Sequence, residues 1–280
     1  MTDEMLATGR DHFAPEAARL AGGTALAYTA RDPTADRPNE DALALLPLDD
    51  ERAVIALADG AGGEPGGAEA AALTLRTLQR SLREARAQPP AEGLRAAILD
   101  AIEAANRLVL NTLPGALTTL EVVEIGTWHV RSYHIGDSGT LLMGGRGRIK
   151  YRTISHSPVG YAVEAGLVEA GEALFHEDLH LVSNLLGTRE MRIDIGPRLR
   201  LAPRDTLLVA SDGLGDNLLP RELIELARKS PLERVRDRLA ALGRRRMLEP
   251  AAGTPSKPDD LSFVLFRPGP ARGPAVEGRG

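Results

Sequence analysis

The sequence predicts an α+β fold in which sheets and helices form separate layers of one domain. Hydrophobic residues make up 43% of the 280 residues, enough to build a large core. Short apolar runs that end in glycine-containing or acidic turns indicate buried strands. The strands come in blocks with two long helical segments between them, and the chain contains no internal repeat. This order suits layers of sheet and helix.

The N-terminal half begins with a polar, Ala-rich extension at residues 1–22, where positions 15–20 have helix-compatible spacing that ends at Gly22-Gly23. Strands are predicted at 25–29, 42–47 and 53–58. The third is a continuous apolar run, typical of a fully buried strand. Helices are predicted at 68–86 and 92–113, with Pro89-Pro90 as the break between them.

The C-terminal half begins with four consecutive strands separated by glycine-containing turns, at 118–124, 127–135, 139–143 and 150–154. Further strands are predicted at 191–195, 206–210 and 261–266, and helices at 163–186, 221–229 and 232–242. The main domain is expected to span 23–267. The Pro/Gly-rich tail, 268–280, is predicted to be disordered.

Composition excludes several classes of function. Lys and Arg number 34 against 39 Asp and Glu, and the net charge of −5 disfavours a general nucleic-acid binder. The absence of cysteine excludes a disulfide framework, a thiolate metal site and a cysteine nucleophile. No uncharged run reaches the roughly 18–20 residues of a membrane span, and the acidic start is unlike a signal peptide. We therefore expect a cytoplasmic protein without nucleic-acid or membrane partners.

Acidic residues mark the ends of the predicted strands. They are Glu40-Asp41, Asp59, Asp137, Asp212 and Asp259-Asp260. Any single Asp-Gly after a strand is also explained as a turn. All five sites together, however, place carboxylates where unpaired negative charge next to apolar backbone is costly. Converging carboxylates need cations, and hard oxygen ligands favour Mg²⁺ or Mn²⁺ over Zn²⁺.

An ordered set of short motifs runs from about Thr24 to Phe266. The motifs are Asn39-Glu40-Asp41, Asp59-Gly60-Ala61-Gly62-Gly63, Ala116-Leu117-Thr118-Thr119-Leu120, Gly136-Asp137-Ser138, Ser155-His156-Ser157, Ser211-Asp212-Gly213 and Asp259-Asp260-Leu261-Ser262. Together they resemble the metal-dependent protein phosphatase 2C family, in its bacterial serine/threonine form. The resemblance implies an α-β-β-α four-layer sandwich with two central antiparallel sheets flanked by helices.

The resemblance also implies an activity. Members of the family hydrolyse phosphoserine and phosphothreonine on proteins with two, sometimes three, Mn²⁺ or Mg²⁺ ions and a metal-bridged hydroxide. The substrates would be phosphorylated proteins, modified by a serine/threonine kinase. The alternative is a catalytically weak pseudophosphatase that acts as a regulatory binding module.

Site residues follow from the motif matches. Asp59 would bridge two ions and act in catalysis, and the carbonyl of Gly60 would bind the first ion. Asp212 and Asp259 would bind the second ion, and Asp137 a third, weaker one. Glu40 and Asp41 match the opening acidic pair, and which of them touches metal stays open, although Asp41 is also expected to act in catalysis. The family's phosphate-binding arginine corresponds to position 36, which here is Asp36, so Arg37 is the candidate clamp.

Three other motifs have competing explanations. His176-Glu177-Asp178-Leu179-His180 has the spacing of a zinc-protease helix, but an ordinary polar helix is favoured. The Gly-rich stretch 60–67 lacks the Lys-Ser/Thr ending of a nucleotide-binding loop. Arg244-Arg245-Arg246 is explained as a solvated helix end, with a partner-binding patch as the alternative.

Overall fold

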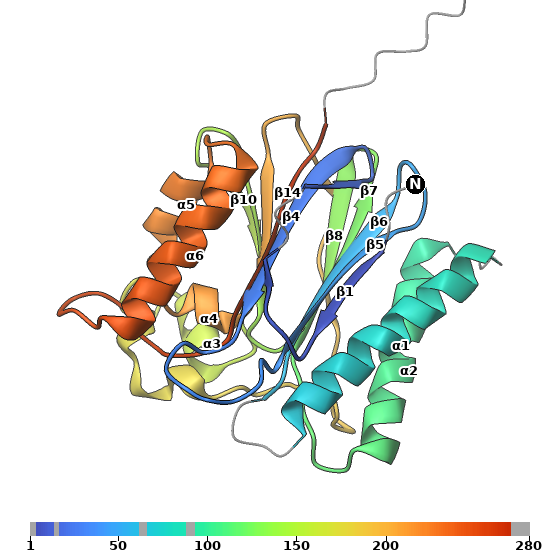
Figure 1. Cartoon of the computed structure of the whole chain (residues 1–280), viewed down its shortest axis with the longest axis horizontal. Helices are drawn as coiled ribbons and strands as arrows, with labels where there is room; N and C mark the ends of the chain where they lie inside the picture. Colours follow the sequence, from blue (N-terminus) through green and yellow to red (C-terminus); the bar gives the residue numbers. More distant parts are fainter. Residues whose placement is uncertain (1–3, 14–16, 62–65, 88–92, 270–280) are drawn as a thin grey trace, which may run out of the picture.

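The computed structural model describes residues 4–13, 17–61, 66–87 and 93–269, which form two antiparallel sheets stacked face to face between layers of helices (Figure 1). The central strands are apolar on both sides because both of their faces are covered. In β5, Ala42, Ala44 and Leu46 pack toward the helices, while Leu43 and Leu45 pack between the sheets. The predicted four-layer α-β-β-α sandwich is confirmed.

The first sheet has the order β1-β5-β6-β7-β8-β11, with β12 also paired to β8. Its strands are β1 Met5–Thr8, β5 Asp41–Pro47, β6 Ala53–Asp59, β7 Leu120–Gly126, β8 His129–Ile135, β11 Asp194–Ile195 and β12 Leu199–Arg200. The second sheet has the order β10-β9-β13-β14-β4-β2, with β3 also paired to β4. Its strands are β2 His12–Phe13, β3 Ala18–Leu20, β4 Gly23–Ala30, β9 Gly139–Met143, β10 Ile149–Arg152, β13 Thr206–Ala210 and β14 Leu261–Arg267.

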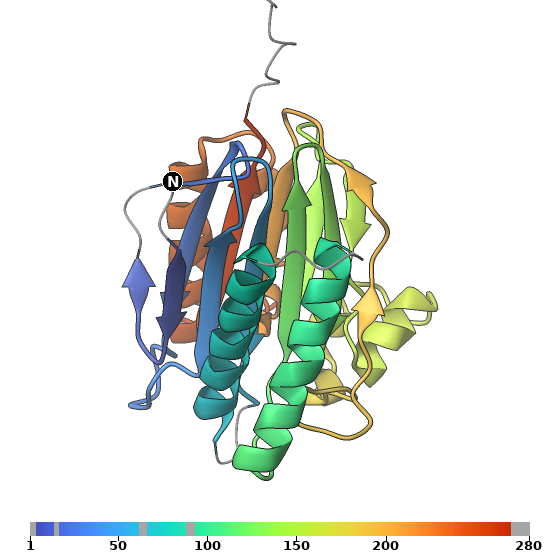
Figure 2. The same ribbon diagram turned by 90° about the vertical axis from the view of Figure 1, so that its right-hand side faces the viewer.

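Each sheet is covered by its own helices. The long helices α1 Gly67–Ala87 and α2 Leu94–Thr112 pack on the first sheet (Figure 2). On the second sheet lie α4 Asp212–Gly215, α5 Pro220–Ala227 and α6 Leu232–Leu248, whereas α3 Pro158–Glu164 follows β10. No helix in the described ranges combines the length and the apolar character needed to cross a membrane.

The structure corrects three predictions of secondary structure. Residues 18–20 form a strand rather than a helix, because Leu20 is buried between the sheets and β3 pairs with β4. Residues 163–186 are mostly loop, since Gly166 adopts φ +70° and ends α3, leaving only the short 3-10 helices Ala173–Phe175 and Glu177–His180. The last helix extends to Leu248. The expected disordered tail lies outside the described residues from 270 onward.

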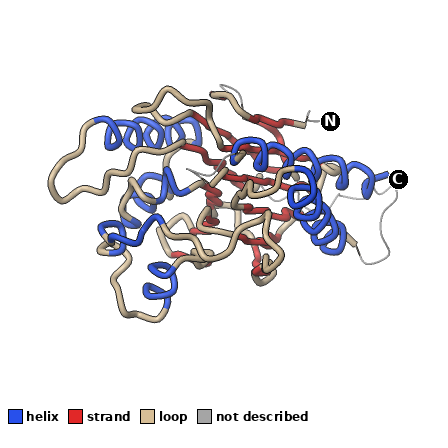
Figure 3. The backbone as a smooth tube through the Cα atoms, turned by 90° about the horizontal axis from the view of Figure 1, so that it is seen from below, coloured by secondary structure: helices blue, strands red, loops and turns tan. Residues whose placement is uncertain are grey.

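One end of the sandwich collects the acidic strand ends. Because β5 and β6 are antiparallel, the start of one lies beside the end of the other. The β8–β9 loop, α4 and the start of β14 reach the same end, the lower one in Figure 1 and the one that Figure 3 faces. Segments about 200 residues apart in the chain therefore meet there.

Candidate metal centre

Asp41 and Asp59 lie directly opposite each other across β5 and β6. Asp41 is only 1% exposed. The backbone of Asp59 is held on both sides: its carbonyl accepts hydrogen bonds from Thr118 Oγ1 and the Thr119 amide, both at 2.8 Å, and its amide donates to Thr119 Oγ1 at 3.1 Å. The end of β6 is thus fixed where its carboxylate meets that of Asp41.

The position after Asp59 requires glycine, because the backbone of residue 67 packs closely against it. A Cβ atom at Gly60 would lie 2.4 Å from the carbonyl carbon of Gly67. The Gly60 amide donates to the carbonyl of Glu40 at 3.2 Å, which continues the pairing of β5 and β6 past the strand ends. Only glycine fits this close approach.

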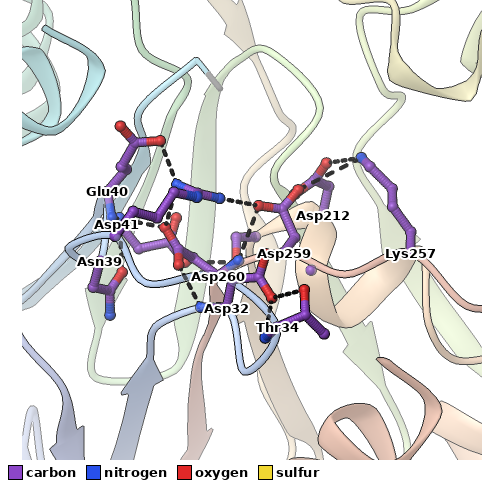
Figure 4. Close-up of polar contacts among 12 residues, drawn as sticks. Asp32, Thr34, Asn39, Glu40, Asp41, Asp212, Lys257, Asp259 and Asp260 are labelled. Carbon is purple, nitrogen blue, oxygen red and sulfur yellow. Dashed lines mark hydrogen bonds and ion pairs between the residues drawn. The ribbon is translucent and has the colours of Figure 1, made fainter. Parts of the chain in front are cut away.

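Asp212 and Asp259 come from α4 and from the segment before β14. Gly213 lets these segments touch, since a Cβ atom there would lie 1.9 Å from the carbonyl oxygen of Asp260. Asp260 itself accepts hydrogen bonds from the amides of Asp32 and Glu40, both at 2.7 Å. The two adjacent aspartates therefore have different roles. Asp260 holds the loop before β5, whereas Asp259 lies near Asp212 (Figure 4).

Arg37 lies within the cluster. Its guanidinium contacts Glu40 at 2.5 Å, and Asp259 and Asp260 at 3.3 Å each. The side chain of Asp36, by contrast, is fully exposed. The loop before β5 thus brings Arg37 to the carboxylates, although it lies one position after the place where the family has its arginine.

Asp137 is positioned by the turn after β8. Gly136 has φ +106°, and a Cβ atom there would lie 2.7 Å from the Thr119 side chain. The Gly136 amide donates to Nδ1 of the buried His156 at 3.1 Å, and Ser138 Oγ lies 2.8 Å from Thr119 Oγ1. The motif around His156 therefore shapes the loop that carries Asp137.

Two further residues at this end were missed by the sequence analysis. Asp216 lies one helical turn after Asp212, a spacing that could have indicated it. Lys257 donates to Asp212 Oδ2 at 2.5 Å and to Asp216 Oδ2 at 2.9 Å, and its Nζ lies 3.8 Å from Asp259 Oδ2. Only the scarcity of lysine, three among 34 basic residues, could have drawn attention to it.

Crowding of the carboxylates changes their acidity. Burial, followed by neighbouring carboxylates, raises the pKa of Asp137 to about 8 and those of Asp216 and Asp259 to about 7. The pKa values of Asp41 and Asp59 are raised well above the ordinary value for the same reasons. Burial would also raise the pKa of Asp212, but Lys257, together with Asp59 and the Gly213 amide, outweighs burial, and this pKa is lowered.

The donor set fits hard divalent cations. Within the described residues, Asp41 Oδ1 and Asp212 Oδ1 are buried without a hydrogen-bond partner, so both oxygens are free for a cation. Of the opening acidic pair, only Asp41 has such an oxygen among the described residues, whereas Glu40 contacts Arg37, and this favours Asp41 as the ligand. In this part of the chain no three Asp, Glu or His side chains already close around one point, and several of the carboxylates turn to Arg37 and Lys257 instead. Carboxylate oxygens suit Mg²⁺ and Mn²⁺.

The cluster also borders an open space. A cavity of about 250 Å³ is lined by Asp137, Asp212 and Asp216 together with mainly apolar residues, several of them from α3, α5 and β9. The carboxylates of this side are thus accessible to small solutes.

The competing motifs lie elsewhere or have structural roles. His176 precedes the 3-10 helix Glu177–His180 instead of lying one α-helical turn from His180, so the zinc-protease geometry is not formed. Of the three arginines, Arg245 is exposed, as a solvated helix end predicts, but Arg246 is buried and paired with Glu222 at 2.7 Å, which corrects the expectation at that position. Residues 62–65 of the Gly-rich stretch lie outside the described residues.

The chain is similar in sequence to proteins of one known family. The sequence profile of the family described as Protein phosphatase 2C matches residues 33–249. The serine/threonine phosphatase stp of Listeria welshimeri is 27% identical over 200 residues, which cover 69% of this chain and 78% of that protein.

Solved structures show the same fold. The PPM Ser-Thr phosphatase MsPP from Mycobacterium smegmatis, in complex with cacodylate, superposes with a TM-score of 0.68 at 25% identity and covers 88% of this chain and 98% of its own. The catalytic domain of serine threonine protein phosphatase PstP, in complex with 2 manganese ions, has a TM-score of 0.67 at 24% identity, with coverage of 87% and 96%.

The family profile covers most of the chain and includes the opening acidic pair, Asp59-Gly60, Asp137 and Asp212. The chain is therefore a member of the protein phosphatase 2C family of serine/threonine phosphatases.

Proposed function

We propose that the chain hydrolyses phosphoserine and phosphothreonine on protein substrates with Mn²⁺ or Mg²⁺ bound at the cluster of Asp41, Asp59, Asp212 and Asp259. The observation that carries the proposal is the pair of buried oxygens, Asp41 Oδ1 and Asp212 Oδ1, that have no partner within the described residues. A buried carboxylate oxygen without a partner is costly, and a cation would satisfy it.

Each carboxylate has a distinct part in this proposal. Asp59 would contact two ions, with the carbonyl of Gly60 as a further ligand, because the fixed end of β6 projects both groups from adjacent positions. Ser211 Oγ donates to Asp41 Oδ2 at 3.0 Å, which leaves Oδ1 as the oxygen available to a cation. When bound, the ions would lower the pKa of water toward neutrality and neutralise the phosphoryl oxygens.

Arg37 would orient the substrate. A guanidinium presents two parallel N–H groups to a phosphate, and about a third of this side chain is exposed at the edge of the cluster. Burial alone would lower the pKa of Arg37, but Asp260, Glu40 and Asp259 raise it, so the cation persists at any pH of interest. A phosphate that binds there would compete with Glu40 and Asp259 for these N–H groups.

The test is phosphate release from a phosphoserine peptide by protein stripped with EDTA and then given Mn²⁺, Zn²⁺ or no metal. Release that requires Mn²⁺, with a phosphotyrosine peptide of the same sequence cleaved far more slowly, is the expected result. A folded protein that binds Mn²⁺ but releases no phosphate would contradict turnover and favour the pseudophosphatase.

A further inference from the structure

The side chain of Lys257 lies at the edge of the carboxylate cluster, and its ammonium contacts Asp212 (Figure 4). Its Nζ contacts Asp212 Oδ2 at 2.5 Å and Asp216 Oδ2 at 2.9 Å, and Asp259 Oδ2 lies 3.8 Å away. The ammonium therefore lies among three carboxylates, at the two ends of α4 and in the segment before β14. Lysine offers a compact point charge with three donors, which resembles a small metal ion more than the planar guanidinium of arginine does.

The backbone of Lys257 is held firmly in place. Its amide donates to Asn217 Oδ1 at 2.8 Å, and its carbonyl accepts from Asn217 Nδ2 at 2.7 Å. Asn217 is completely buried and also donates to the carbonyl of Gly213 in α4. Pro258 restricts the backbone of Lys257 to extended conformations. Through Asn217, the segment that contains Lys257 is therefore fixed against α4, which lies between Asp212 and Asp216.

The charges around Lys257 show which side of the cluster it neutralises. Asp137, Asp212 and Asp216 line the same cavity, and the charges of Asp212 and Asp216, after burial, raise the pKa of Asp137. Lys257 acts in the opposite direction on all three. Burial would lower its own pKa, but Asp212 and Asp216 raise it above the ordinary value, so the ammonium stays charged.

We propose that the Lys257 ammonium is a built-in cation in the place of a third divalent ion beside Asp137, Asp212 and Asp216, so that the chain binds two ions. This inference rests on the proposed function, in which the cluster binds divalent cations at all. It replaces the sequence-based expectation that Asp137 holds a third ion. Lys257 lies beyond residue 249, where the match to the family profile ends, so the profile did not indicate it.

A tethered ammonium differs from a bound ion in a way that can be measured. A third ion would have to approach a positive charge that is held within 3 Å of two of its ligands, and like charges at this distance repel strongly in a partly buried site. Removing the lysine charge should therefore create a cation site that the wild type lacks.

The experiment counts bound Mn²⁺ by equilibrium dialysis and elemental analysis on the full chain. The variant is Lys257→Met, which keeps the apolar stem and removes the charge. The matched control is Lys150→Met: Lys150 is 31% exposed against 27% for Lys257, and it pairs with the buried Asp205 instead of the cluster. Circular dichroism with Mn²⁺ present checks that each variant is folded.

The wild type and the Lys150 variant are expected to bind two Mn²⁺ per chain. The Lys257 variant is expected to bind three, with the additional site at least about tenfold tighter than any residual third site in the wild type. Adding Asp216→Asn to the Lys257 variant should remove the gained ion. The wild-type count alone keeps the inference testable if Lys257→Met does not fold.

Three ions in the wild type, or two ions in both the wild type and the folded Lys257 variant, would overturn the inference and leave the proposed function intact. A wild type that binds no Mn²⁺ would refute the proposed function, and with it the inference that depends on it.

Discussion

Replacing Asp59 with asparagine should have opposite effects on stability with and without metal. Asp59 lies opposite Asp41. Burial is the largest cause that raises the pKa of Asp59, followed by the charge of Asp41 and then by the charges of Asp212, Asp259 and Asp137. Asparagine keeps the size of the side chain and the turn at Gly60, so the fold should persist. In metal-free protein the variant no longer carries a buried carboxyl group whose ionisation is opposed by burial and by its neighbours, which should stabilise it by about 1 kcal/mol. For a domain of this size that raises Tm by about 2–4 °C.

With Mn²⁺ the order should reverse. The amide cannot offer two anionic oxygens, so the variant should bind Mn²⁺ more weakly and gain less than the wild type from RT ln(1 + [L]/Kd). Its kcat on a phosphoserine peptide should fall at least about 10²-fold, roughly 2.7 kcal/mol of barrier. The assay is paired thermal melts and steady-state kinetics, with Asp36→Asn as the control because Asp36 is fully exposed. A folded Asp59→Asn protein with near-full activity would refute the two-ion mechanism.

Three further predictions concern pH, Arg37 and the histidine pair. Because the pKa values of Asp137, Asp216 and Asp259 are raised to about 8, 7 and 7, the folded metal-free protein binds more protons than the unfolded chain between about pH 4 and 8. Its Tm after EDTA treatment should fall as pH rises toward 8, and Mn²⁺ should largely remove this fall; a metal-free Tm that rises over this range would contradict the charge account. Arg37→Ala should lower kcat/KM for a phosphopeptide about 10- to 100-fold, mainly through KM, and unaltered kinetics would exclude the clamp. His176→Ala with His180→Ala should keep Mn²⁺-dependent activity within about threefold, since both rings are exposed and hydrogen-bond to residues two or three positions away; loss of bound zinc together with a peptidase activity would support the zinc-protease explanation instead.

The strands that position the site were largely predictable. Apolar runs such as 53–58 end in Asp-Gly because a buried strand must leave the sheet through a turn, and this pattern is local. The structure places Asp41, Asp59, Asp212 and Asp259 at one end of the sandwich, as the motif order implied. Arg37 also reaches this cluster, although no local pattern indicates where the loop before β5 turns.

The features that the sequence did not predict depend on the three-dimensional fold and not on local patterns. Lys257 meets Asp212 through the fold of the chain before β14, and no periodicity predicts such an ion pair. Helix patterning at 163–186 failed because apolar spacing alone does not reveal that Gly166 ends the helix with a positive φ. Residues 18–20 became a strand because burial of Leu20 between the sheets outweighed local helix propensity.

The central claim is that the cluster around Asp59 is a divalent cation centre. Its most direct test is a crystal structure grown with Mn²⁺, with an anomalous difference map recorded at the manganese absorption edge. Two peaks are expected, both in contact with the Asp59 carboxylate, and no third peak between Asp137 and Asp216. A map without peaks at Asp59, from crystals that retain phosphatase activity when dissolved, would contradict the account.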